Sequence, residues 1–376
     1  MTTSANDSVS STEGKSVVVI GAGGNIGSHL VPHLARATNV REVTLIDRDV
    51  YEHANLFTQD IVARDVGLSK AVVQGRRLAR INAGLRVHVI AKAVERVPLG
   101  LLRADVILAC LDSRRARAYV NQAAWRLGLP WIDAGVEADG MLARVNVYLP
   151  ANGSACMECG WDEQDYLALE QVYPCMDFAE GSYRTNAPSS LGALAASLQA
   201  IECEKVLSGQ LELAAIGQQV LIGATHHKHY VTRYKRNPEC RFYGHETWNI
   251  KKLDTSPRQL TVREAIELGS ISDLNGSAGL RVESSPFVRR LRCVSCGHSR
   301  QILRLQNRLR PSDAKCAGCG KKMVAAGRDL SERLERRALP EKALDRPLHQ
   351  LGFLPGDVFS VGSFADERHF EFGERM

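Results

Sequence analysis

The chain has 376 residues, 44% of them hydrophobic, which is enough for a substantial core and for two domains. Its 48 Lys and Arg against 42 Asp and Glu give a formal charge of +6 that never condenses into a long basic run, so we expect no nucleic-acid partner. No apolar stretch is long enough to span a membrane, and the polar N-terminus, 1–15, is expected to be disordered. These features predict a soluble, cytoplasmic protein.

Strands and helices alternate after the N-terminus. A β-branched strand, 16–20, runs into the glycine turn Gly21-Ala-Gly-Gly-Asn-Ile-Gly27, and a helix follows at 28–37. We expect further strands at 42–46, 87–90, 106–109 and around 131–132, and a helix at 70–82. This alternation predicts an α/β domain with a Rossmann-like, doubly wound and mostly parallel sheet.

The pattern changes after a strand at 145–149. Residues of about 156–188 are Cys-rich and acidic without clear periodicity, which predicts a long crossover loop. A helix at 190–207 and a strand-like stretch at 219–232 complete a first domain of residues 16–245. A smaller α+β domain is expected over 246–376, with a short helix at 261–267, a cysteine-rich block at 293–319 and a strand-like tail at 358–372.

The glycine turn is a candidate phosphate site. Gly21, Gly23 and Gly24 let backbone N–H groups approach a phosphate, and the helix N-terminus adds positive potential. Asp47 ends the second strand about 20 residues beyond the last glycine, where its carboxylate would hydrogen-bond a ribose hydroxyl. A nicotinamide-dependent oxidoreductase would share both features.

A second set of residues favours a triphosphate ligand: Asp49, Asn55, Gln59, Lys70 and Asp112. Lys70 begins a helix and can neutralise charge building on phosphates, whereas Asp112, at the carboxyl end of a strand, can hold magnesium. Each also has an ordinary interpretation, Lys70 as a solvated helix residue and Asp112 as a helix N-cap.

Five motifs occur in order: Gly-x-Gly-Gly, Leu-Ile-Asp-Arg-Asp, Asn-Leu-x-x-Gln, Gly-x-x-Lys and Asp-Ser-x-x-x-Arg-x-x-x-Asn, the last running from Asp112 through Arg117 to Asn121. In order and spacing they resemble the ThiF, MoeB and ubiquitin-activating superfamily of E1-like adenylyltransferases. The resemblance covers about 16–240 and includes Trp131-Ile-Asp-Ala-Gly135. It implies a ThiF-type adenylation domain.

The resemblance also implies ligands and partners. Asp47 would bind the ribose of ATP, Asn55, Gln59 and Lys70 would serve the phosphates together with Asp49, and Asp112 would bind Mg²⁺. The substrate would be a ubiquitin-like or sulfur-carrier protein with a C-terminal glycine, and the enzyme would be a homodimer.

Three departures concern the phosphates. The glycine turn carries one extra residue, Thr58 stands where the family often has an arginine, and the N-terminus lacks the arginine-containing segment that in relatives reaches a partner subunit's nucleotide. Arg48, Arg64 or Arg114 could supply the missing charge.

Six of the ten cysteines form three C-x-x-C pairs, which indicates zinc and not disulfides. The pair Cys156 and Cys159 needs two more ligands, and we expect Cys240 and His245, since Tyr243 stands where the family has a fourth cysteine. The remaining two pairs have zinc-ribbon spacing and form the strongest metal signal: Cys293, Cys296, Cys316 and Cys319.

Of the other cysteines, Cys110 and Cys203 are expected to be buried hydrophobic residues. Cys175 lies in the irregular segment where members of the superfamily carry a thioester or persulfide cysteine. Its thiolate would attack the acyl-adenylate and release AMP. The alternative is a loop thiol without a role.

We therefore expect adenylation of a ubiquitin-like protein, capture by Cys175, and transfer to a conjugating enzyme. The second domain, with its tail Leu351-Gly-Phe-Leu-Pro-Gly-Asp357, resembles a recruitment domain of bacterial activating enzymes that are encoded with ubiquitin-like proteins. Three alternatives stay open: a sulfur-carrier adenylyltransferase for cofactor or tRNA thiolation, an NAD-dependent oxidoreductase, and a non-catalytic zinc-binding scaffold.

Overall fold

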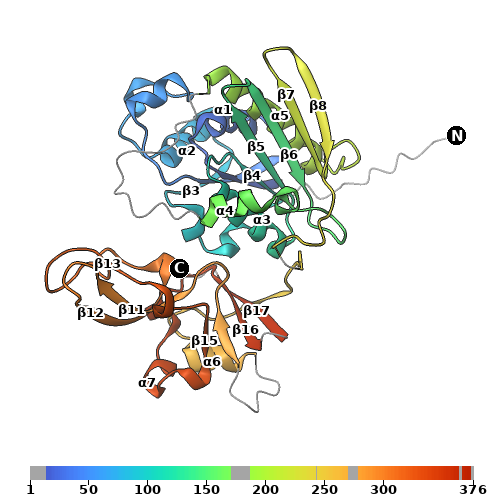
Figure 1. The fold of residues 1–376 in the computed structure, drawn as a ribbon. Helices are drawn as coiled ribbons and strands as arrows, with labels where there is room; N and C mark the ends of the chain where they lie inside the picture. The colour runs from blue at the N-terminus through green and yellow to red at the C-terminus, as the bar shows by residue number, and fades with distance from the viewer. Residues whose placement is uncertain (1–13, 171–186, 243, 270–277, 364–365, 374–376) are drawn as a thin grey trace. The chain divides into compact units, whose positions relative to one another are not determined.

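A large mixed sheet organises the N-terminal part of the chain in the computed structural model, which describes residues 14–170, 187–242, 244–269, 278–363 and 366–373 (Figure 1). The chain divides into two units. The first comprises Met1–Lys92, Ala104–Ala124 and Leu129–Tyr243, and the second comprises Ala93–Arg103, Trp125–Gly128 and Gly244–Met376.

The sheet of the first unit has eight strands in the order β3-β2-β1-β4-β5-β6-β7-β8. The strands from β3 to β5 pair in parallel, and β6, β7 and β8 continue the sheet antiparallel. Their bounds are β1 (Lys15–Ile20), β2 (Val40–Ile46), β3 (Arg86–Ile90), β4 (Val106–Ala109), β5 (Trp131–Glu137), β6 (Leu142–Tyr148), β7 (Gln218–Gly223) and β8 (Lys228–Arg233). The helices are α1 (Asn25–Leu34), α2 (Lys70–Ile81), α3 (Arg114–Leu127), α4 (Glu163–Glu170) and α5 (Ser189–Leu207).

Both faces of the parallel strands are covered. The core of one face joins α1 and α5 to the sheet, with Val17 and Val19 of β1 buried against Leu30 and Leu191. Connections between parallel strands are right-handed, and the chain turns one way from β1 to β2 and the other way from β4 to β5, so α1 and α3 lie on opposite faces. The order reverses between β1 and β4, and such a switch point is where α/β sheets bind ligands.

The second unit contains two smaller sheets. One has the strand order β15-β10-β16-β17-β9, and the other has β12-β11-β13 with β14 also pairing β11. Their bounds are β9 (Ile250–Leu253), β10 (Gly279–Arg281), β11 (Phe287–Cys293), β12 (Ser299–Leu305), β13 (Met323–Val324), β14 (Leu330–Ser331), β15 (Arg333–Glu335), β16 (Val358–Ser363) and β17 (Asp366–Phe372), with short helices α6 (Val262–Glu267) and α7 (Glu341–Leu344). Phe353 packs edge-on against Phe359 and Phe372 in the core of this unit.

The parallel-dominated sheet and the smaller cysteine-containing unit confirm the predicted α/β class. Several local expectations differ from the structure. The helix expected at 28–37 is α1, which begins and ends three residues earlier, and the tail at 358–372 contains two antiparallel strands, β16 and β17. The stretch 219–232 is a hairpin of β7 and β8, because the chain reverses at 224–227, where His227 takes a positive φ of 51°. The first part of the segment 156–188 contains α4, whose start is held by reciprocal backbone-to-carboxylate hydrogen bonds between Asp162 and Asp165.

None of the helices that the structure describes combines the length and apolar character needed to cross a membrane.

Candidate functional site

The glycine turn lies at the carboxyl end of β1, beside the switch point. Gly21 has a φ of 79°, and a side chain there would overlap the carbonyl of Cys110, so the turn passes directly against the end of β4. Gly24 is the N-cap of α1 and makes no side-chain cap. The first N–H groups of α1 are therefore left without a side-chain partner at this end, which is the arrangement that binds a phosphate.

Asp47 braces this turn. Its Oδ2 accepts the backbone N–H of Gly23 at 2.8 Å, and its Oδ1 accepts the N–H of Asp49 at 3.0 Å. The residue is 7% exposed, and burial raises the pKa of its carboxyl although both backbone hydrogen bonds act to lower it. Each oxygen keeps a lone pair, so a ribose hydroxyl can still donate to Asp47.

Lys70 is buried at the first position of α2, with 8% of its surface exposed. Its side-chain stem fills the space next to Gly23, and its Nζ lies 5.6 Å from the centre of the Tyr51 ring. No carboxylate among the described residues forms an ion pair with it. The nearest acid that acts on it is Asp47, whose own carboxyl is buried and has a raised pKa, so the charge of Lys70 is only partly compensated and suits an anionic ligand.

The remaining candidates of the phosphate set lie between β2 and α2. Asp49 accepts the N–H of Lys70 through its backbone carbonyl at 2.9 Å, and Asn55 uses its Oδ1 to accept the N–H of Glu52 at 2.8 Å. Gln59 has a buried Oε1 without a hydrogen-bond partner in the described chain. Asn55 therefore shapes the loop, whereas Gln59 has an acceptor available for a ligand.

Asp112 is exposed just beyond β4, at the same edge of the sheet as the glycine turn. Arg117 and Asn121 of its motif make structural contacts. Arg117 donates to Asp133 at 2.9 Å and to the carbonyl of Leu111, the residue before Asp112, and Asn121 donates to Glu158 at 3.1 Å. Arg117 thus holds the loop that carries Asp112 against β5.

Asp133 lies at the centre of a buried network of hydrogen bonds, and the motifs of the sequence do not identify it as a site residue. Its carboxylate is fully buried in β5 and accepts hydrogen bonds from Arg117 at 2.9 Å, Arg144 at 2.8 Å and Asn146 at 3.3 Å. Burial acts to lower the pKa of Arg144, but the contact with Asp133 outweighs it and raises that pKa. The signal in the sequence is an acid between apolar residues of a buried strand, because a buried carboxylate needs cations close to it.

The three arginines considered for the missing phosphate charge lie at the surface. Arg48 approaches Asp49 at 3.5 Å, and Arg114 pairs with Asp165 of α4. Arg64 is exposed in the loop before α2. Two of the three therefore already have acidic neighbours. Lys70, which lies beside the glycine turn, is better placed than these arginines to contact phosphates.

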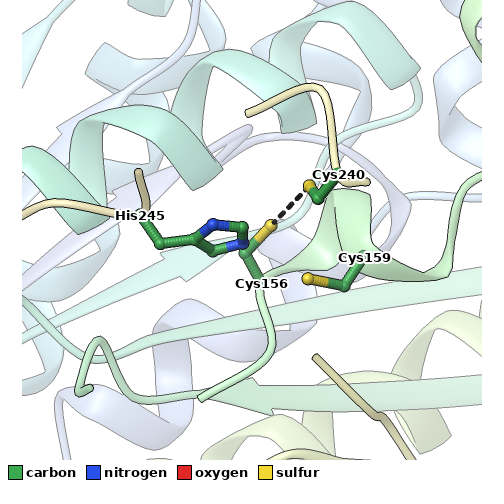
Figure 2. Close-up of side chains that lie close together, drawn as sticks. All are labelled: Cys156, Cys159, Cys240 and His245. Carbon is green, nitrogen blue, oxygen red and sulfur yellow. Dashed lines mark hydrogen bonds between the residues drawn. The ribbon is translucent and has the colours of Figure 1, made fainter. Parts of the chain in front are cut away.

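The first cysteine cluster is shown in Figure 2, where the thiols of Cys156, Cys159 and Cys240 and the imidazole of His245 point toward one another. Their ligand atoms all lie within 4.8 Å of one another, and Cys156 Sγ and Cys240 Sγ are 3.8 Å apart. Ligands of a tetrahedral zinc with bonds of about 2.3 Å lie about 3.8 Å apart, so the spacing fits zinc.

The donor chemistry of this cluster also suits a metal. All four residues are buried, and hydrogen bonds from the Cys156 and Cys240 thiols lower the pKa of Cys159, which favours a thiolate. Glu158, between the two cysteines of the pair, is held by Asn121 and by Gln122 at 3.2 Å. These contacts fix the turn that presents the ligands.

The second cluster contains the four ribbon cysteines. Cys293 Sγ lies 3.5 Å from Cys319 Sγ, and Cys296 Sγ lies 3.6 Å from Cys316 Sγ, again within the range for tetrahedral zinc. Backbone N–H groups of Cys296 and Ser295 lower the pKa of Cys293 to about 6. This favours the thiolate of Cys293, the form that a metal needs.

The structure describes two of the three remaining cysteines. Cys175 lies outside the described residues. Cys110 and Cys203 are 9% and 1% exposed, and burial raises the pKa of Cys203 to about 12, so neither is a nucleophile.

Residues 5–242 match the model of the ThiF family. The match covers more than half of the chain, and the chain belongs to the ThiF family, which confirms the resemblance in its motifs. Ubiquitin-like modifier-activating enzyme 5 of Gallus gallus is 23% identical over 270 residues, covering 67% of this chain and 65% of that protein. Adenylyltransferase and sulfurtransferase UBA4 of Yarrowia lipolytica is 28% identical over 148 residues, covering 39% of this chain and 36% of that protein.

The chain thus spans less than two thirds of the length of these curated relatives. Among solved structures, E. coli MccB with ATP is similar, with 26% identity, a TM-score of 0.49, and coverage of 61% of this chain and 66% of that one.

Proposed function

We propose that this protein is an ATP-dependent activating enzyme that adenylates the C-terminal glycine of a ubiquitin-like protein. The observation that carries the proposal is Lys70, a buried ammonium group beside the glycine turn with no ion-pair partner in the described chain. A triphosphate supplies the missing negative charge, whereas a nicotinamide dinucleotide needs no cation at this place. Membership of the ThiF family and similarity to ubiquitin-like modifier-activating enzyme 5 support the same activity.

The chemistry requires little proton transfer. An oxygen of the substrate's C-terminal carboxylate attacks the α-phosphorus of ATP, the bond from that phosphorus to the bridging oxygen breaks, and pyrophosphate leaves with the electron pair. The N–H groups at the start of α1 and the ammonium of Lys70 stabilise the charge on the phosphates. Asp112 would hold Mg²⁺, which supplies further positive charge, and Asp47 would orient the ribose.

A second step is proposed for Cys175. Its thiolate attacks the carbonyl carbon of the acyl-adenylate, the bond to the phosphate oxygen breaks, and AMP leaves with the electron pair, so that a thioester is formed. The acyl group would then pass to a conjugating enzyme. We further propose that both cysteine clusters hold zinc, and that residues 246–376 act as a recruitment domain.

The second candidate is a sulfur-carrier adenylyltransferase, favoured by the similarity to UBA4 of Yarrowia lipolytica. This enzyme would carry out the same adenylation for cofactor or tRNA thiolation without passing its carrier to a conjugating enzyme. A zinc-binding scaffold without catalysis is the third.

The decisive experiment is ATP:pyrophosphate exchange with candidate ubiquitin-like proteins ending in glycine. We expect exchange in the wild type and a loss of at least about 100-fold in Lys70→Met, because a buried phosphate contact is removed. Lys92→Met is the matched control, since Lys92 is exposed in the same unit and should leave the rate unchanged. Asp112→Asn, compared with the exposed Asp139→Asn, tests the magnesium ligand in the same way.

A non-reducing gel then separates the candidates. Exchange with a thiol-sensitive adduct that is absent in Cys175→Ala supports the ubiquitin-type reaction, and exchange without an adduct supports the sulfur-carrier reaction. No exchange with any carrier would overturn both and leave the scaffold.

A further inference from the structure

The small sheet of β11 to β14 carries an unusual concentration of positive charge. Residues 287–331, here called the ribbon, contain 11 Lys and Arg but only two acidic residues, Asp313 and Asp329. Four thiolates and a zinc ion would contribute two negative charges, which still leaves the ribbon strongly positive. The charge of the whole chain is only +6, so the rest of the protein is close to neutral or acidic.

The fold gathers cations that are separated in the sequence. Lys315 and Lys322 face each other in an antiparallel bridge, and the N–H of Cys316 donates to the carbonyl of Lys321 at 2.8 Å. Arg310 joins them, because its carbonyl accepts the N–H of Ala314 at 3.3 Å at the base of the same loop. These four exposed residues, the knuckle cations, lie just before and just after the second cysteine pair of the ribbon, Cys316 and Cys319, which is here called the second zinc knuckle.

The acidic residues of the ribbon do not neutralise the knuckle cations. Asp329 is paired with Arg292 at 2.8 Å, and the side chain of Asp313 lies 3.5 Å from Arg304. Among the described residues, no ion pair involves Arg310, Lys315, Lys321 or Lys322. Their charge is therefore available to a partner.

The ribbon has little apolar surface with which to dock a folded protein. Its only Phe, Tyr or Trp is Phe287, which is fully buried, and its core residues Val288, Leu291 and Met323 are buried as well. Val294, 78% exposed, is its one large exposed apolar residue among those described. Protein interfaces depend on buried apolar anchors, whereas a phosphate backbone is bound by exposed Lys and Arg alone.

We propose that the ribbon binds the phosphate backbone of a nucleic-acid duplex through the knuckle cations, without reading its sequence. The sequence alone predicts no such partner, because the basic residues never form a long run. The antiparallel pairing around the zinc knuckle is what brings them together. Without aromatic side chains for stacking on bases, binding should be electrostatic and sensitive to salt.

The test is fluorescence anisotropy of the full chain with labelled DNA and RNA duplexes of about 20 base pairs, each in two unrelated sequences, over about 50 to 200 mM salt. The triple variant Lys315→Gln, Lys321→Gln, Lys322→Gln removes three knuckle cations. Its matched control, Lys251→Gln, Lys252→Gln, Arg258→Gln, removes three exposed cations from the same unit outside the ribbon. Thermal melting verifies that both variants are folded.

We expect binding that is equal for the two sequences, and a slope of log affinity against log salt that falls by about 2 to 3 in the ribbon variant but not in the control. ATP:pyrophosphate exchange should be the same in all three proteins, so failure of the proposed function would not affect the result. The proposal is overturned if neither duplex binds at low salt, if the control variant loses as much affinity, or if poly-glutamate of equal charge competes as well as a duplex, which would indicate an acidic protein partner.

Discussion

The carboxylate of Asp47, at the end of β2, accepts the backbone N–H of Gly23 at 2.8 Å and so braces the glycine turn that follows β1. The acid expected to orient a ribose is thus also part of the turn that would hold the phosphates. Ligand binding and local stability are coupled at this residue, and the coupling can be tested by pH.

Burial raises the pKa of Asp47 above that of an exposed aspartate, which is about 3.9. The folded state then binds the proton more tightly than the unfolded state. The contribution to stability is complete below the unfolded pKa and is lost as the pH rises through the folded pKa. We expect the free energy of unfolding of the wild type, relative to Asp47→Asn, to be larger near pH 4 than near pH 7, measured by urea denaturation without nucleotide. An equal or opposite difference would contradict the burial argument.

Substitutions at two neighbouring glycines should distinguish an effect on folding stability from an effect on nucleotide binding. A Cβ on Gly23 would lie 2.8 Å from the hydroxyl of Tyr51 and overlap the stem of Lys70, so Gly23→Ala should cost about 1–3 kcal/mol of stability. A Cβ on Gly24 would meet nothing closer than the carbonyl of Gly21 at 3.5 Å, so Gly24→Ala should cost only the weaker N-cap preference of Ala, about 0.5–1 kcal/mol.

The same pair tests the phosphate site. Gly24→Ala places a methyl group at the start of α1, where the phosphates are expected, and should weaken ATP binding at least about tenfold. Isothermal calorimetry and thermal melting measure the two effects. Unchanged ATP affinity in a folded Gly24→Ala protein would place the phosphates elsewhere.

The number of zinc ions bound per chain should show whether both cysteine clusters hold zinc. We expect two zinc ions per chain by mass spectrometry of the metal, one for each cluster, and one in Cys240→Ser. Cys203→Ala is the control, because that buried thiol lies outside both clusters. A chelator that removes the zinc should lower the melting temperature.

A substitution at His245 tests the ligand set of the first cluster directly. Its backbone φ of 46° is strained for a residue with a side chain. His245→Gly relieves about 1 kcal/mol of strain but also removes a buried ring that packs edge-on against Trp125, so zinc content and not stability is the readout. We expect His245→Gly to lose one zinc ion per chain. Full zinc content in the folded variant would remove His245 from the ligand set.

Dimerisation should depend on the exposed apolar residues of the segment between β2 and α2. Phe57 is 83% exposed, and Val50, Val62 and Leu68 are 50%, 51% and 39% exposed. Such a group favours association. We expect a homodimer that shifts toward monomer in Phe57→Ser at micromolar concentration, measured by light scattering. Val294→Ser, which removes a solitary exposed apolar residue, should behave as the wild type, and a monomeric wild type would refute the proposal.

Local patterns predicted much of the first unit. The strand at 106–109 coincides with β4, and the helix at 70–82 differs from α2 by one residue, because runs of apolar residues with a regular period define buried strands and helices. The expectations for 156–188 and 219–232 were less accurate. The sequence of α4 has little apolar periodicity from which a helix could be predicted. The reversal between β7 and β8 depends on a positive φ at His227, which the residue type does not predict.

The sequence by itself determined the family, through motifs whose residues are close together along the chain, and it named the candidate ligands of the nucleotide and of zinc. Only the tertiary structure decided which of them share a site and in what state. The contact of Asp47 with Gly23 and the burial of Lys70 beside Gly23 and Tyr51 depend on how distant segments pack. Composition and spacing specify which groups are available, whereas charge, desolvation and hydrogen bonding act between groups that only the fold brings together.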